Sequence, residues 1–134
     1  MYEGSCLCGA IKYAVNGELG DAVYCHCSRC RKASGSAFAA NSAIADTSFK
    51  IVSGNERLKT FSTSEGVHRT FCSACGSPIM SRRDSLPGVL RLRLGTLDRA
   101  TRGPMAHIFV GSKADWYEIR DSLPQYVERT PRKP

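Results

Sequence analysis

The chain has 134 residues, the size of one domain, and is too short for a two-domain enzyme. Its 19 Lys and Arg residues against 12 Asp and Glu give a formal charge of +7, and its seven cysteines, an odd number, exclude a fully paired set of internal disulfides. No apolar run approaches the roughly 20 residues of a membrane-spanning helix, and the residues before Cys6 do not have the pattern of a secretory signal. We expect a cytoplasmic protein without membrane contact, whose thiols stay free unless a metal binds them.

Alternation of apolar and polar residues predicts several short strands in the first half of the chain. It appears in Ile11, Tyr13 and Val15, again in Phe49 and Ile51, and more weakly over residues 67–71. Between the first two patterns, residues 28–34 predict one short helix, with Ser28 as its N-cap.

The clearest strand pattern lies later, where Leu90, Leu92 and Leu94 alternate with Arg91 and Arg93. It predicts a strand with its leucines in the core and its arginines on a solvated face. Turn sequences at residues 16–17, 53–55, 64–66 and 86–88 are too closely spaced for long helices between most of them. We therefore predict a mainly β fold of antiparallel sheets in one domain, residues 1–126, followed by a frayed C-terminal tail, residues 127–134.

The cysteines have the spacing of metal ligands. They form three groups, namely Cys6 and Cys8, then Cys25, Cys27 and Cys30, then Cys72 and Cys75. Thiolates this close on a turn can reach one ion at about 2.3 Å each, and the glycine after Cys75 allows a tight turn. The first and third groups together predict a closed, structural four-thiolate zinc site, in preference to buried apolar cysteines or a redox pair.

The second group leaves one metal position without a cysteine. Such an open position is what a catalytic zinc needs, so Cys25, Cys27 and Cys30 are predicted to act through a second zinc. The alternative is a closed site completed by His26, His68 or His107. Because His26 lies between two ligands, an extended backbone would point it to the other side, which favours a packing or supporting role.

Two zinc ions per chain would change both stability and charge. Structural zinc can supply on the order of 10 kcal/mol of folding free energy, which is large for a domain of short strands. Seven thiolates add −7 and two Zn²⁺ ions add +4, so that the formal charge falls to +4. The milder charge, and the dispersion of the basic residues, argue against nucleic acid as the partner.

The cysteine groups and their neighbours resemble the glutathione-dependent formaldehyde-activating enzyme family, whose domain also occurs in a vertebrate centromere protein. The matching segments are residues 4–9, 25–32 with 35–38, 69–78 and 95–98, followed by Pro104, residues 107–109, Trp116, Asp121 and Leu123-Pro124. They occur in the family's order over most of the chain.

The resemblance implies a β-tent fold pinned by zinc, with the four-cysteine site structural and the three-cysteine site catalytic. It also implies a carbon–sulfur lyase of the S-hydroxymethylglutathione synthase type, whose partners are a small thiol such as glutathione and a small aldehyde such as formaldehyde. The namesake enzymes are longer chains, and no extra segment is present here for a glutathione-binding surface.

Two other classes of function stay open at this stage. One is a zinc-ribbon-like module that binds nucleic acid or protein without catalysis, and the other is a redox sensor in which the second cysteine group loses zinc on oxidation.

Among the remaining residues, Arg29, Arg31 and Lys32 flank the second group and could bind carboxylates or simply face solvent. Arg91 and Arg93 are expected to face solvent. His107 is expected to be a hydrogen-bonded core residue. Phe38 either lines the zinc pocket or fills the core.

Overall fold

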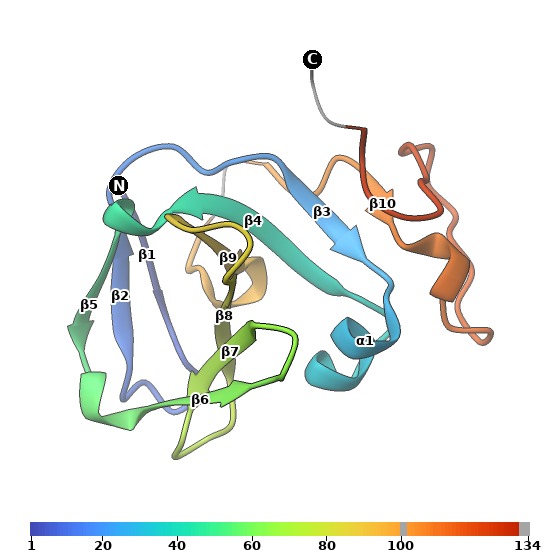
Figure 1. Ribbon diagram of the computed structural model, residues 1–134. Helices are drawn as coiled ribbons and strands as arrows, with labels where there is room; N and C mark the ends of the chain where they lie inside the picture. Colours follow the sequence, from blue (N-terminus) through green and yellow to red (C-terminus); the bar gives the residue numbers. More distant parts are fainter. Residues whose placement is uncertain (100–101, 132–134) are drawn as a thin grey trace.

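The computed structural model describes residues 1–99 and 102–131, and in this part the chain forms two β-sheets and one short α-helix (Figure 1). The smaller sheet consists, in spatial order, of β1 (Tyr2–Ser5), β2 (Lys12–Val15) and β5 (Phe49–Ser53). The larger sheet consists, in spatial order, of β10 (His107–Ile108), β3 (Ala22–Cys25), β4 (Ala39–Ala45), β9 (Val89–Arg93), β8 (Pro78–Arg83), β7 (Val67–Cys72) and β6 (Leu58–Ser62). All neighbouring strands in these sheets are antiparallel except β10 and β3, so the predicted mainly β class is confirmed.

The main core lies where the smaller sheet packs on one face of the larger sheet. Tyr13 and Val15 come from β2, Leu90 and Leu92 from β9, and Ile79 from β8, and all five are buried. Each such side chain contributes about 1.5–3 kcal/mol by leaving water. The described residues also contain four short 3-10 turns, namely Asp46–Ser48, Asn55–Arg57, Leu94–Thr96 and Val110–Ser112.

The arginines of β9 are not both on a solvated face, as the sequence predicts. Arg93 is only 7% exposed, Arg91 is half-buried, and Leu94 has left the strand for a 3-10 turn. The alternation itself is correct, because Leu90 and Leu92 are fully buried. Both arginines instead line a cavity in the protein.

The predicted helix is present as α1 (Ser28–Ser34), but the prediction of Ser28 as its N-cap is wrong. Cys27 is the N-cap, and its sulfur accepts a hydrogen bond from the backbone N–H of Cys30 at 3.3 Å. A thiol can therefore replace the expected hydroxyl of Ser28, which lies inside the first turn. The helix ends at Gly35, whose left-handed φ of 64° suits glycine.

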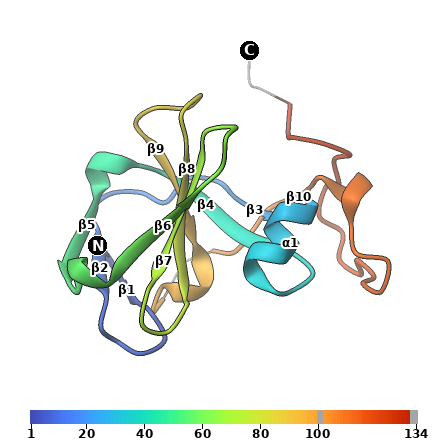
Figure 2. The same ribbon diagram turned by 60° about the horizontal axis from the view of Figure 1, so that its bottom comes forward.

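After β9 the chain runs to the end of the larger sheet that is formed by β3, beside α1 (Figure 2). There β10 pairs with β3, and the backbone N–H of His107 donates to the carbonyl of Pro124 at 2.9 Å. The backbone N–H groups of Gly111 and Phe109 donate to the carbonyls of Val127 and Glu128, the first residues of the predicted tail. The domain boundary at residue 126 stays a prediction, and residues 132–134 of the tail lie outside the described residues.

Neither α1 nor any of the 3-10 turns in the described ranges has the length and apolar character needed to cross a bilayer.

Candidate metal centres and the cavity beside them

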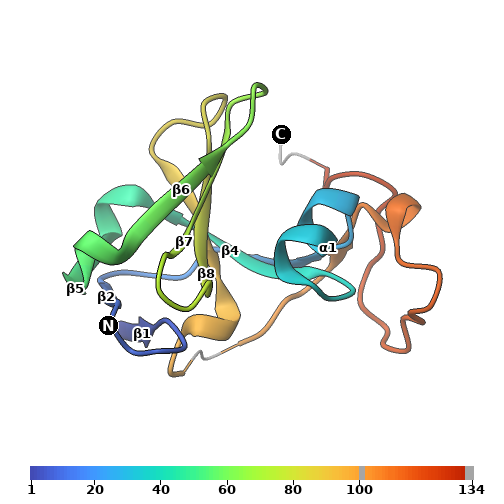
Figure 3. The same cartoon turned by 90° about the horizontal axis from the view of Figure 1, so that it is seen from below.

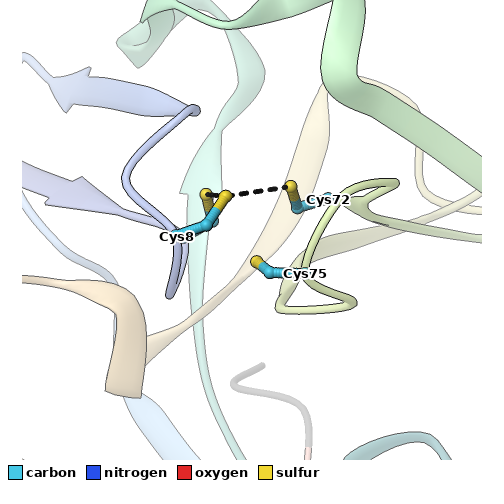
Figure 4. Close-up of side chains that lie close together, drawn as sticks. Cys8, Cys72 and Cys75 are labelled. Atoms are coloured by element: carbon cyan, nitrogen blue, oxygen red, sulfur yellow. Dashed lines mark hydrogen bonds between the residues drawn. The ribbon is translucent and has the colours of Figure 1, made fainter.

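The first cysteine cluster joins two turns that are far apart in sequence. Cys6 and Cys8 lie in the β1–β2 turn, and Cys72 and Cys75 lie at the β7–β8 turn. Figure 4 shows the sulfurs of Cys8, Cys72 and Cys75 turned toward one another. The first two of these sulfurs are 3.9 Å apart although 64 positions separate their residues. This cluster thus lies between the smaller sheet and the larger one, where a bound metal ion would join them.

The arrangement of the four sulfurs fits a tetrahedral metal ion. All four lie within 4.8 Å of one another, and the Cys6–Cys8 distance is 3.6 Å. Bonds of about 2.3 Å in tetrahedral zinc coordination place sulfurs about 3.8 Å apart, close to both observed separations.

Backbone amides support the same cluster. N–H groups of Cys8 and Ser77 donate to the Cys75 sulfur and lower its pKa to about 6, which favours the thiolate that a metal requires. Gly9 and Gly76, one after each cysteine pair, have φ near +79° and +78°, the left-handed conformation that the tight turns require.

The second cluster is built within one short segment, from the end of β3 into α1. The sulfurs of Cys25, Cys27 and Cys30 lie within 4.8 Å of one another. The thiols of Cys25 and Cys30, followed by nearby backbone N–H groups, lower the pKa of Cys27 to about 2, whereas the bond to Cys27 raises the pKa of Cys25. Negative charge therefore collects on Cys27, between two hydrogen-bonding neighbours.

The predicted partition into four and three sulfurs is found in the structure, since both groups could each hold a metal ion. Within the described ranges, no fourth His, Cys, Asp or Glu joins the second group. The identity of the ion as zinc, and the structural and catalytic roles of the two groups, stay predictions.

None of the three histidines completes the second cluster. His26 is fully buried and its ring Nε2 lies 2.8 Å from Nδ1 of His107, whose Nε2 donates to the Asp121 carboxylate at 3.0 Å. His68, on β7, bonds instead to Ser62 and to Asp84. The alternative of a closed site through a histidine is thus not what the structure contains among its described residues.

The His26–His107–Asp121 chain connects the cysteine segment to the C-terminal segment. Burial, and then the neighbouring His107, lower the pKa of His26 to about 4, so that it is neutral near pH 7. Since the Asp121 carboxylate accepts the proton of His107 Nε2, Nδ1 of His107 accepts from His26. His107 is thus the hydrogen-bonded core residue that the sequence predicts, and His26 packs against Phe38 and Tyr117.

A cavity of about 640 Å³ adjoins the second cluster. Its wall includes two of the cluster's cysteines, three arginines of β7 and β9, and an aromatic residue after β10, namely Cys25, Cys30, Arg69, Arg91, Arg93 and Phe109. We call it the arginine cavity. In the view of Figure 3, α1 and the C-terminal segment lie on one side of the molecule, and the β6–β7 and β8–β9 hairpins lie on the other. Residues from both sides belong to the cavity wall.

Phe109 is the one described non-glycine residue with a left-handed backbone, at φ 57°. Its N–H donates to the Glu128 carbonyl at 2.8 Å, and the Arg129 guanidinium lies over its ring at 5.8 Å from the centroid. Such a conformation costs free energy in an aromatic residue, and it occurs here at the wall of the arginine cavity.

The cations that the sequence singles out are not the ones that line the cavity. Arg29 is exposed and pairs with Glu65, and neither Arg31 nor Lys32 belongs to the cavity wall. Phe38 packs against Tyr24, His26 and Tyr117, and Trp116 is 70% exposed. Sequence analysis misses Arg69, which stands in the weak alternation of residues 67–71, and assigns Arg93 to solvent.

Comparison with known proteins gives consistent results. The family model described as glutathione-dependent formaldehyde-activating enzyme matches residues 1–112. A Schizosaccharomyces pombe protein named "Uncharacterized lyase C29B12.13" is 37% identical over 78 residues, which are 58% of this chain and 55% of that protein. The chain thus matches about half the length of this curated relative.

A crystal structure of a Rhodobacter sphaeroides protein superposes with a TM-score of 0.63 at 27% identity, over 73% of this chain and 89% of that one. The family match covers far more than half of the sequence and includes both cysteine clusters. With two metal-competent cysteine clusters on a mainly β fold, the chain belongs to the glutathione-dependent formaldehyde-activating enzyme family.

Proposed function

We propose that the protein is a zinc-dependent carbon–sulfur lyase that forms or cleaves the adduct of a thiol and a small carbonyl compound. The simplest such reaction joins glutathione and formaldehyde to give S-hydroxymethylglutathione, as the family name suggests. In this direction the thiol sulfur attacks the carbonyl carbon, one carbon–sulfur bond forms, and the thiol proton ends on the carbonyl oxygen. No oxidant or further reactant is needed.

One observation carries this proposal: the three-sulfur cluster borders a cavity large enough for a small-molecule substrate. Cys25 and Cys30 belong to the cavity wall, so a ligand in the cavity would lie against the cluster. The four-sulfur cluster is not part of this wall. The difference supports a chemical role for the three-sulfur cluster and a structural role for the other.

Cys25, Cys27 and Cys30 would hold the zinc ion, which supplies a Lewis acid and a template for thiol and carbonyl groups. The thiolate character of Cys27 favours binding of a cation at this place. Around it, the cavity wall would orient the substrate and exclude part of the water that competes for the carbonyl carbon. We place the reaction in a reducing compartment, the cytoplasm, where the thiols stay available.

The test is the rate of exchange between formaldehyde plus glutathione and S-hydroxymethylglutathione, measured by NMR with and without the protein. Because the adduct also forms spontaneously, only an accelerated exchange that disappears in Cys27→Ser supports enzyme activity. Ser28→Ala is the matched control, since Ser28 is exposed and adjacent. Absence of acceleration, together with salt-sensitive DNA binding, would favour the binding-module alternative.

A further inference from the structure

Ser81 lies among three arginines on the face of the larger sheet that borders the arginine cavity. It is opposite Arg91 on β9 and opposite Arg69 on β7, and Arg83 follows it by two residues on β8. Paired residues of neighbouring strands, and residues two apart on one strand, have their side chains on the same face. All four residues belong to the cavity wall, and we call them the Ser81 site.

The polar groups of the Ser81 site lack partners within the protein. Ser81 is 7% exposed, and its hydroxyl forms no hydrogen bond with any described residue. The side chains of Arg69, Arg83 and Arg91 likewise form no ion pair or hydrogen bond within the described ranges, and Nη1 of Arg69 is buried. Unpaired buried donors and positive charges cost free energy, so this site is prepared for an anion.

The Ser81 site is set apart from the three-cysteine cluster by the sheet register. Along β4, the partner of Cys25 comes four residues before the partner of Arg91. Four residues of a strand span about 13 Å. Arg93 lies between these two positions and already donates to the side-chain oxygen of Asn41. A ligand at the Ser81 site therefore does not need to contact the cysteines.

The number of donors and their charge favour a phosphoryl group over a carboxylate. One guanidinium can pair both oxygens of a carboxylate, whereas three guanidiniums and a hydroxyl can bind the three terminal oxygens of a phosphate monoester. Such an ester carries a charge of about −2 above pH 7, against three arginines. The one carboxylate in the described cavity wall, that of Asp21, lies 3.5 Å from the Arg102 guanidinium instead.

The cavity has room for more than a phosphoryl group, because its volume is about 640 Å³. Beyond the arginines, its wall includes the apolar side chains of Val23, Ile108 and Phe109. These residues suit the organic part of a phosphate ester, which free phosphate lacks. An ester therefore fits this cavity better than the inorganic ion does.

We propose that Ser81, with Arg69, Arg83 and Arg91, forms a binding site for the phosphoryl group of a phosphate monoester. The arginines supply charge and paired N–H donors, and the serine hydroxyl donates to one phosphoryl oxygen. The site goes beyond the proposed lyase reaction, since neither glutathione nor formaldehyde contains a phosphoryl group. Binding makes and breaks no covalent bond.

The test is isothermal titration of the zinc-loaded protein, at about pH 8 and fixed ionic strength, with methyl phosphate and methyl sulfate. The two esters have the same shape, but the phosphate is doubly charged and the sulfate is singly charged. We expect methyl phosphate to bind about tenfold more tightly. Equal affinities would contradict the proposal, because the site would then not distinguish the phosphoryl group.

Substitutions on the two faces of β8 provide a matched comparison. Arg83→Gln and Arg91→Gln should each weaken binding of methyl phosphate about tenfold, since each removes a charged hydrogen-bond donor. Ser81→Ala should weaken it about threefold, although it changes no charge. Arg82→Gln should bind like the wild type, because Arg82 is exposed and lies outside this cavity wall. An equal loss in Arg82→Gln and Arg83→Gln would indicate attraction by overall charge and overturn the proposal.

Propyl phosphate and inorganic phosphate distinguish the two sources of a phosphoryl group. We expect propyl phosphate to bind more tightly, because the apolar part of the wall contacts its carbon atoms. Tighter binding of inorganic phosphate would contradict the assignment to an ester. Circular dichroism checks the fold of each variant, and Arg83→Gln, at the last residue of β8, keeps the test decisive if Arg91→Gln does not fold.

Cys27→Ser separates this site from the proposed function. The variant is expected to lose the metal of the three-cysteine cluster and the accelerated exchange of glutathione and formaldehyde. Its binding of methyl phosphate should be unchanged, since Cys27 is not part of the cavity wall. Loss of binding in this variant would place the anion on the metal ion and contradict the Ser81 site. Methyl phosphate binding without accelerated exchange in the wild type would contradict the lyase activity alone.

Discussion

The two cysteine clusters use the same ligand atoms in different surroundings. The four-cysteine cluster brings together turns 64 positions apart, from two sheets, whereas the three-cysteine cluster lies within six consecutive residues of one segment. The first cluster has no place in the wall of the arginine cavity, and the second contributes two of its cysteines to it. A metal that closes a long loop stabilises the fold, while a metal on a local segment beside a cavity is available for a ligand.

The largest expected effect is loss of the fold when the four-cysteine cluster is broken. Structural zinc contributes on the order of 10 kcal/mol, as much as the whole stability of a typical domain. We expect Cys72→Ser, and likewise Cys6→Ser, to be insoluble or unfolded. Circular dichroism of the soluble fraction measures this, with Ser73→Ala as the exposed neighbouring control.

Cys27→Ser should have a smaller and different effect. Serine is itself a favourable N-cap, so α1 is expected to persist while the metal loses a ligand. The variant should be folded and contain one metal ion fewer than the wild type, by elemental analysis. If Cys6→Ser, Cys72→Ser and Cys27→Ser all folded equally well, the partition into a structural and a chemical cluster would be wrong.

Acid should empty the two clusters in sequence. Metal binding to the three-cysteine cluster requires the thiol of Cys25 to ionise, although the bond to Cys27 raises its pKa. In the other cluster backbone amides lower the pKa of Cys75 to about 6, although the neighbouring thiols raise the pKa of Cys8 to about 11, so the difference between the clusters rests on the fourth thiolate that also holds the metal there. As the pH falls, the three-cysteine cluster should therefore release its metal first.

A chromophoric zinc indicator detects the released ion, and circular dichroism follows the fold in the same titration. One release step that coincides with unfolding would show that the two clusters do not differ in this way.

The smallest expected effect concerns the histidine chain behind the three-cysteine cluster. In Asp121→Ala the buried His107 loses the acceptor for its Nε2–H, and an unsatisfied buried donor destabilises the fold. Asp84→Ala removes the equivalent partner of the more exposed His68 and is the matched control. Asp121→Ala should lower Tm more than Asp84→Ala does. Equal decreases in Tm would indicate that the hydrogen bonds of His26, His107 and Asp121 do not stabilise this part of the fold.

Sequence reasoning predicts the local features of this molecule well. The spacing of the cysteines predicts the partition into four and three, and the leucine alternation predicts the buried face of β9. Residues 28–34 predict α1 because its helix-forming residues are local. These features depend on neighbours along the chain, which a sequence displays directly.

The arginine cavity could not be predicted because it depends on packing between distant segments. Alternation places Arg91 and Arg93 opposite the leucines, but only the return of the C-terminal segment beside β3 turns that face into a cavity wall. The prediction of Ser28 as the N-cap of α1 is wrong for a related reason, since Cys27, which was predicted as a metal ligand, also serves as the N-cap. Arg69 shares a face with Arg91 only through two strand pairings.

The most direct test of the difference between the clusters is native mass spectrometry of the zinc-loaded protein before and after brief treatment with a chelator. Our account predicts two zinc ions per chain at first, then one, with an unchanged circular dichroism spectrum and with the remaining ion lost only on unfolding. A single zinc ion at the start, or loss of both ions together with the fold, would contradict it.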